Sequence, residues 1–173
     1  MYSIFFIVIF YVIHKYYLIF LHYQQSKKLE TMFTKQNLLA TLAGFVVMFL
    51  LGYVIWGYAT VDFFEPHTLN DIMKDPPEML LLAISNVIAV FALSSIYGKW
   101  ARGIHSTGQG FKFGIWIGIF TGLGLGLLNQ STTELMDMTG RIVEAILEIV
   151  FYGIIGAVIA LVYKATAPKA ATA

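Results

Sequence analysis

The stretch GFKFGIWIGIFTGLGLG, residues 110–126, repeats glycine at every fourth position inside a strongly apolar region. Each glycine weakens a helix by about 1 kcal/mol relative to alanine, so five in register call for a structural reason. Positions four apart form one ridge on a helix, and a glycine ridge lets a neighbouring backbone come very close. We expect the ridge to wind around a membrane-spanning helix. We call this set the glycine ridge: Gly110, Gly114, Gly118, Gly122 and Gly126.

The last apolar segment of the chain offers a matching surface for the glycine ridge. Its small residues also recur four apart, Gly153 with Ala157 and Gly156 with Ala160. Packing through small residues on both helices predicts a right-handed crossing of about −40°. The ridge is then structural, and a sliding or gating seam is the functional alternative.

Composition places the chain in a membrane. It has 173 residues, of which 58% are hydrophobic and 12% charged, and its mean hydropathy is +0.75. Soluble domains carry about 25% charged residues. A spanning helix needs about 20 apolar residues, and four runs are long enough: residues 38–59, 79–97, 113–128 and 142–163. We predict an all-α polytopic transmembrane helical bundle, with four core helices in a domain covering residues 32–164.

Residues 1–31 allow two interpretations. Residues 2–23 are apolar and aromatic, but His14 and Lys15 lie in their middle. A lysine at the bilayer centre costs about 2.5–3.5 kcal/mol on insertion scales. The segment is either a fifth helix in which Lys15 reaches the interface or is paired, or an over-extended start with Met32 as the true initiator. Residues 165–173 form a short tail.

The charges of the loops predict an orientation. Acidic residues dominate the second and fourth loops, whereas the first, third and last flanking segments are basic. The positive-inside rule therefore places both ends of the four-helix core in the cytoplasm. A net charge of +1 gives no indication of nucleic-acid binding. The basic residues on the predicted inner side are Lys27, Lys28, Lys35, Lys99, Arg102, Lys112, Lys164 and Lys169.

Two acids interrupt the last apolar run. Glu144 and Glu148 share one helix face with Arg141, because the three residues are three and four positions apart. A carboxylate at the depth of Glu148 must be paired, protonated or exposed to water. The small residues lie on a different face of the same helix, so both faces need a partner. This favours a homo-oligomer or a second membrane protein.

A polar cluster is predicted near the outer mouth of the bundle. Its functional interpretation is a cation or proton site, since burial favours the protonated form of a carboxyl group. The alternative is an asparagine–glutamate hydrogen bond that sets helix register, with Arg141 neutralising Glu144. The candidate ion or proton site consists of Asn86, Asn129, Gln130, Glu144 and Glu148.

No cofactor, metal site or catalytic residue is predicted. Asp62, Glu65 and His67 share an acidic loop, but they lack the spacing of a calcium loop. The four histidines do not pair at one depth of two core helices, as bis-histidine haem ligation would need. Metalloprotease, nucleophile-elbow and P-loop motifs are missing from the sequence, so an enzyme is not expected.

Three segments carry a resemblance: LGYVIWGYATVDFF, GKWARGI with the following GFKFGIWIG, and TTELMDMTGRIVEAILEIVFYGIIGAVIALVYK. They resemble small four-helix bacterial membrane proteins that are grouped as a domain of unknown function. The resemblance covers about residues 36–164 and has soft motifs. It implies a bacterial cytoplasmic (inner) membrane location, and it brings no catalytic residues.

Two functions follow as expectations. The first is a structural, accessory or assembly component whose helices pack through the glycine ridge, in contact with the lipid bilayer. The alternative is a small permease or ion pathway that uses Glu148 and Asn86. Glu148 discriminates between them, because transport needs it in a water-accessible cavity and assembly needs it buried against a neighbour.

Overall fold

A computed structural model describes residues 14, 15 and 32–167 of the chain. The two interpretations of residues 1–31 and the end of the predicted tail lie almost wholly outside these residues. Apart from Lys35 at the start of α2, helices α2 to α7 belong to one compact unit, Gln36–Ala173.

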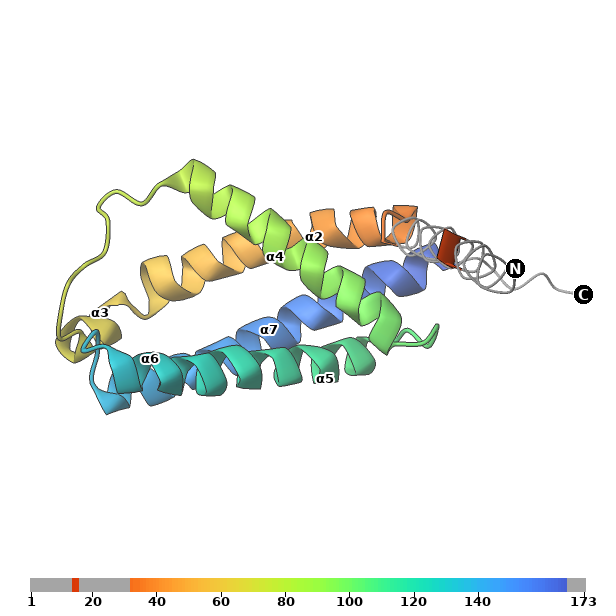
Figure 1. Cartoon of the computed structure of the whole chain (residues 1–173). Coiled ribbons are helices and arrows are strands. Elements are labelled where there is room, and N and C mark those ends of the chain that lie inside the picture. Colours follow the sequence, from red (N-terminus) through yellow and green to blue (C-terminus); the bar gives the residue numbers. More distant parts are fainter. Residues whose placement is uncertain (1–13, 16–31, 168–173) are drawn as a thin grey trace, which may run out of the picture. The chain divides into compact units, whose positions relative to one another are not determined.

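The described fold is all-α, as predicted, and four helices in it are long and apolar enough to cross a membrane (Figure 1). The four predicted spans are thereby confirmed, with longer bounds: Lys35–Ala59, Met79–Trp100, Thr107–Thr132 and Met138–Thr166. Their elements are α2 (Lys35–Val54) with η1 (Ile55–Ala59), α4 (Met79–Trp100), α5 (Thr107–Gly118) with η3 (Ile119–Leu125) and α6 (Gly126–Thr132), and α7 (Met138–Thr166). The short elements α3 (Val61–Phe64) and η2 (Glu65–His67) follow the first span.

The third span extends well past the apolar run that marked it in the sequence. The Ser106 side chain accepts a hydrogen bond from the backbone N–H of Gln109 at 3.2 Å, so the polar turn after Ser106 is already helical. Asp137 caps α7 in the same way, accepting from the backbone N–H of Gly140 at 2.8 Å. Hydropathy marks the apolar stretch of a helix, whereas capping side chains determine where it starts.

Helix α7 is the element on which the others pack. In its most apolar window 39% of the residues are buried, against 17% in α4. Ile155 and Ile159 of α7 are fully buried in the core. The first span reaches α7 through Trp56 of η1, whose ring makes an edge-to-face contact with that of Phe151, with centroids 4.9 Å apart.

The span formed by α5 and η3 runs alongside α7 in close backbone contact (Figure 1). A Cβ added at any of the first four ridge glycines would overlap with backbone atoms of α7; at Gly122 the nearest are the Cα and carbonyl oxygen of Ala145, both at 2.9 Å. Gly126 instead faces the Cδ of Arg141 at 3.4 Å. Ala157 is half-buried and is not among the atoms nearest to the ridge. The α7 residues that face the five glycines in turn are Gly156 with Ala160, Tyr152 with Gly153, Ile149, Ala145 and Arg141.

A widened turn keeps the ridge aimed at α7. In a regular α-helix the 16 residues from Gly110 to Gly126 would rotate the ridge by about 160°, nearly to the opposite side. Residues Ile119–Leu125 are π-helical instead. A turn of π-helix closes one residue later than a turn of α-helix, so it contains more than four residues. Four residues therefore fall short of a full turn in the π segment, whereas they exceed a full turn in an α-helix. From one glycine to the next, the ridge rotates around the helix axis in the opposite direction. This segment therefore offsets the drift accumulated along α5.

Large apolar side chains cover the outside of the described helices. Leu42 and Leu50 of α2, Ile88 of α4 and Trp116 of α5 are all at least 60% exposed. Such a surface is unfavourable in water and suits contact with lipid tails. The apolar surface and the four spans agree on a membrane environment.

Adding one methyl group to the ridge should destabilise the fold. We expect Gly114→Ala to lower the free energy of unfolding by about 1–3 kcal/mol, since the new Cβ would overlap with the carbonyl group of Tyr152. The measurement is thermal or denaturant unfolding in detergent, followed by circular dichroism.

The matched control is Gly124→Ala in the same span. The only atom near an added Cβ there is the carbonyl oxygen of Ile119 at 3.9 Å, so no loss is expected. Equal stability of both variants would contradict a backbone contact at the ridge.

Candidate functional site

Two loops are joined at one end of the bundle, which we call the acidic-loop end (residues 60–78 and 133–137). Leu69 donates its backbone N–H to the carbonyl of Leu135 at 2.9 Å, and Asp137 donates to the carbonyl of His67 at 2.9 Å. Thr68 and Met136 form an isolated antiparallel bridge between the two loops. The loop after the first span is thus held against the start of α7.

A histidine–aspartate pair strengthens this junction. Nδ1 of His67 lies 2.8 Å from Oδ2 of Asp137, and the other carboxylate oxygen of Asp137 caps α7. The backbone N–H of Gly140 and the bond to His67 lower the pKa of Asp137. Asp62 and Glu65 are exposed, and within residues 14–15 and 32–167 no three His, Asp or Glu residues are grouped as metal ligands would be.

Arg141 lies at the centre of a polar cluster one turn into α7. Its side chain is almost fully buried and forms an ion pair with Glu144. Its Nε donates to Oε1 of Gln130 at 3.3 Å, and Nε2 of Gln130 donates to the carbonyl of Met136 at 3.1 Å. Gly126 makes room for the arginine stem. The arginine is therefore held by charge from α7 and by a hydrogen bond from α6.

Glu148 lies one turn beyond Glu144 along α7, and about two turns beyond Arg141. Its Oε2 is buried and has no hydrogen-bond partner in the described part of the chain. The segment η3 packs against α7 at this point, and a Cβ added at Gly122 of η3 would lie 3.2 Å from the Cβ of Glu148. Glu148 interacts electrostatically with Glu144 and with Tyr152.

The structure divides the predicted polar cluster. Gln130 and Glu144 meet through Arg141, and Glu148 lies beside Glu144. Asn129 is exposed at the end of its span, and its carbonyl accepts from the backbone N–H of Thr133 at 2.8 Å. Asn86 is half-buried on α4, and no hydrogen bond of its side chain occurs among the described residues. The two asparagines are therefore not part of the arginine–glutamate cluster.

A second buried polar cluster, at the end that carries the loop of residues 101–106 (the basic-loop end), was missed by the sequence analysis. Asn37 is 1% exposed, and its Nδ2 donates to Oγ of Ser95 at 2.9 Å. The hydroxyl of Tyr163 donates to Oδ1 of Asn37 at 3.3 Å and to the carbonyl of Ser94 at 3.1 Å. Gly98 leaves space for this tyrosine, since a Cβ there would lie 2.7 Å from its hydroxyl. The cluster ties α2, α4 and α7 together.

Aromatic rings enclose this second cluster. The ring of Tyr97 meets those of Phe113 and Tyr163, each with centroids 5.5 Å apart. The ring of His105 lies 5.1 Å from that of Tyr163, and burial lowers the pKa of His105. Ser94 and Ser95 fall inside a predicted span, and Asn37 immediately precedes another. A comparison of polar residues at equal depth along neighbouring spans would have identified this second cluster from the sequence.

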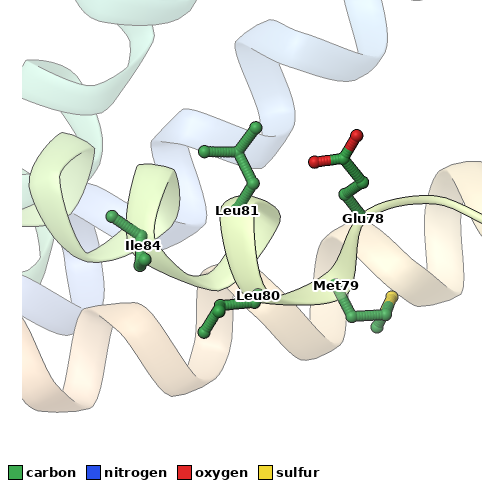
Figure 2. A pocket seen from close by; sticks show the side chains of 5 residues that line it. All are labelled: Glu78, Met79, Leu80, Leu81 and Ile84. Carbon is green, nitrogen blue, oxygen red and sulfur yellow. The ribbon is translucent and has the colours of Figure 1, made fainter.

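A shallow hollow occurs at the start of α4 (Figure 2). Its five lining residues come from one continuous stretch, and Glu78 is the polar one. Ligand sites normally collect polar groups from several elements. The hollow is therefore the surface of an uncovered helix end, lined by Glu78, Met79, Leu80, Leu81 and Ile84.

No family model matches the chain, and comparisons with curated proteins and with solved structures found no match. The four spans, the apolar exterior and the polar clusters nevertheless define the class: a small multi-pass α-helical membrane protein. The resemblance noted in the sequence is supported at that level, with no family identified.

Removing one hydroxyl should test the second cluster. We expect Tyr163→Phe to destabilise the protein by about 0.6–1.7 kcal/mol, the range for hydrogen bonds between membrane helices. Unfolding in detergent is the measurement, and Tyr53→Phe, at a side chain 66% exposed, is the control. Equal stability of the two variants would mean that the tyrosine hydroxyl contributes nothing.

The His67–Asp137 pair predicts a dependence of stability on pH. The pKa of Asp137 is lower in the folded protein, so its contribution is complete above the ordinary aspartate value of about 3.9 and is lost as pH falls through the lowered value. Asp137→Asn retains the cap but not the charge. We expect the difference in melting temperature between wild type and Asp137→Asn to shrink as pH falls below about 4. A difference that grows on acidification would contradict this origin.

Proposed function

We propose that this protein is an assembly component of its membrane, without catalysis, and that it associates with a second copy of itself through the first half of α4. The observation that carries the proposal is that this half-helix is uncovered. Buried residues of α4 begin only at Val90, and every earlier residue is exposed or half-buried.

The uncovered half of α4 presents side chains on all sides. Leu80 is 77% and Ile88 64% exposed, and Leu81 leaves the helix on a different side from Leu80 (Figure 2). A helix in a membrane bundle normally contacts lipid with one face and packs against neighbouring helices with the opposite face. Ala83, Asn86 and Ala89 are only half-buried, so even the best-covered face of this half-helix is incompletely packed.

Asn86 supplies the specific contact for that face. It lies seven residues after the start of α4, which is about 10 Å along the helix and within a hydrocarbon core of about 30 Å. Water does not satisfy its amide at that depth, so a partner helix lowers the free energy. An asparagine amide both donates and accepts, so two copies of Asn86 can satisfy each other.

The neighbouring residues suit a twofold pair of α4 helices. Ser85 and Ala89 are small residues four apart, which allows two backbones to approach. A twofold contact uses the same patch of both copies, and so it places Asn86 opposite Asn86. Lys74 forms an ion pair with Glu78 at the start of α4, which reduces repulsion between the two copies there.

The orientation and compartment complete the proposal. Four antiparallel spans place the start of the first and the end of the last on one side. Lys99, Arg102 and Lys112 lie at that side, at the basic-loop end, and support its placement in the cytoplasm. The resemblance supports a bacterial cytoplasmic membrane.

A permease is the second candidate, and the buried Oε2 of Glu148 is the observation in its favour. Transport needs polar groups that continue across the bilayer. On α7, the polar side chain after Glu148 is Tyr152, and none then follows before Tyr163. The assembly role is therefore the better supported of the two.

Removing the asparagine amide tests the assembly role. The measurement is the monomer–dimer equilibrium in liposomes, from energy transfer between labelled copies at a series of protein-to-lipid ratios. We expect Asn86→Leu to weaken association by about 3- to 20-fold, from about 0.6–1.7 kcal/mol per interhelical hydrogen bond.

Asn129→Leu is the matched control, because Asn129 is exposed at the end of its span. It should associate like the wild type. A wild type that stays monomeric at every ratio, or an Asn86→Leu variant that associates normally, would overturn the proposed role.

A further inference from the structure

We infer that the basic-loop end binds the head group of an anionic phospholipid through Lys99 of α4, Arg102 of the following loop and Lys112 of α5. We call these three residues the cationic patch. The inference goes beyond the assembly role, because it assigns a ligand to the end of α4 that lies away from Asn86. It also does not require a second copy of the chain.

The charges of the cationic patch are not neutralised within the described part of the chain. All three residues are exposed, and no ion pair joins any of them to a residue that the structure describes. The described segments at this end are residues 32–42, 94–113 and 160–167, and they contain no Asp or Glu. They add two further cations, Lys35 and Lys164. An anion from outside the protein would therefore be attracted to this end.

Cations at the acidic-loop end have carboxylate partners. Lys74 forms an ion pair with Glu78, and Arg141 forms one with Glu144. Exposure does not explain the difference between the two ends, because the side chain of Lys74 is itself 70% exposed. Of the two ends of the bundle, the basic-loop end is the one whose cations repel each other without a nearby carboxylate.

Aromatic packing brings the members of the cationic patch to one level of the bundle. The ring of Trp100 in α4 lies 5.6 Å from that of Phe113 in α5, measured between centroids. Lys99 and Lys112 each adjoin one of these two rings in the sequence. Between them, Arg102 has a positive φ of 48°, which turns the chain sharply from one helix to the next. The patch thus combines two helix ends and the loop that joins them.

The length of α4 places the cationic patch at the depth of lipid head groups. The helix has 22 residues and is therefore about 33 Å long. A hydrocarbon core is about 30 Å thick, so both ends of α4 reach the interface where lipid phosphates lie. Trp100, next to Lys99, is typical of that interface.

Exposed apolar side chains alternate with the cations along the sequence. Trp100 is 42%, Ile104 67% and Phe111 39% exposed, and each lies within two residues of a member of the cationic patch. A free phosphate ion would leave these side chains uncovered. A phospholipid presents acyl chains beside its phosphate and can cover them while it neutralises the cations. Charge and apolar surface together therefore favour a lipid over a soluble anion.

Native mass spectrometry of the full chain in a non-ionic detergent tests the site. The probes are phosphatidylglycerol and phosphatidylcholine with the same acyl chains, so that the lipids differ in head-group charge. We expect the wild type to bind phosphatidylglycerol more than about tenfold more tightly than phosphatidylcholine. Arg102→Gln should weaken binding of phosphatidylglycerol by about fivefold, because each cation near an anionic lipid contributes a factor of this order.

Lys74→Gln is the matched control, because it removes one exposed positive charge from the opposite end of the bundle. This variant should bind phosphatidylglycerol like the wild type. Equal binding of the two lipids by the wild type, or an equal effect of the two substitutions, would overturn the lipid site. Glycerol phosphate carries the charge without acyl chains, and equally tight binding of this probe would also overturn it.

Thermal unfolding of the wild type in the same detergent provides a reading that needs no variant. Phosphatidylglycerol should raise the melting temperature more than phosphatidylcholine does, and the difference should shrink in about 0.5 M salt, because salt screens exposed charges. A difference that is missing, or that salt leaves unchanged, would contradict an electrostatic site. The Asn86→Leu variant should bind phosphatidylglycerol like the wild type, which separates this test from that of self-association.

Discussion

Direct backbone contact between α7 and the span formed by α5 and η3 holds the helices of this protein together. In lipid, apolar side chains gain little by leaving the solvent, so helices must associate through close van der Waals packing. Four of the five ridge glycines remove the side chain at the point where the α7 backbone arrives. The loss of helix propensity at these glycines is offset by contacts that larger residues would prevent.

The same contact makes α7 the axis of the protein. One of its faces meets the glycine ridge, and α2 and α4 pack on others through Phe151, Ile155 and Tyr163. Polar groups then hold the two ends. Arg141 joins α7 to α6 at the acidic-loop end, and Asn37 joins α2 to α4 and α7 at the basic-loop end. Apolar packing in the middle and hydrogen bonds at the ends together determine helix register.

Two features remain outside this self-contained core. The first half of α4 has no fully buried residue, and the side chain of Asn86 makes no hydrogen bond with the residues that the structure describes. Glu148 is half-buried, and its Oε2 has no hydrogen-bond partner among the described residues. The first feature is a polar side chain on an incompletely packed helix, and the second is a carboxylate oxygen in the contact between two helices. A partner helix would satisfy the first of these two features.

Hydropathy over about 20 residues depends on composition alone, so the sequence was enough to predict the membrane environment, the all-α class and the four spans. It also marked the glycines and Glu148 as unusual, since their cost to a membrane helix is local. Tertiary structure alone decided which polar residues meet. It separated Asn86 and Asn129 from Glu148, formed the Asn37–Ser95–Tyr163 cluster, and paired His67 with Asp137 across 70 residues. The π-helical segment that keeps the glycine ridge directed at α7 was likewise visible only in the tertiary structure. Helix rotation, splay and local winding depend on how neighbouring backbones fit, and a single sequence pattern does not contain that information.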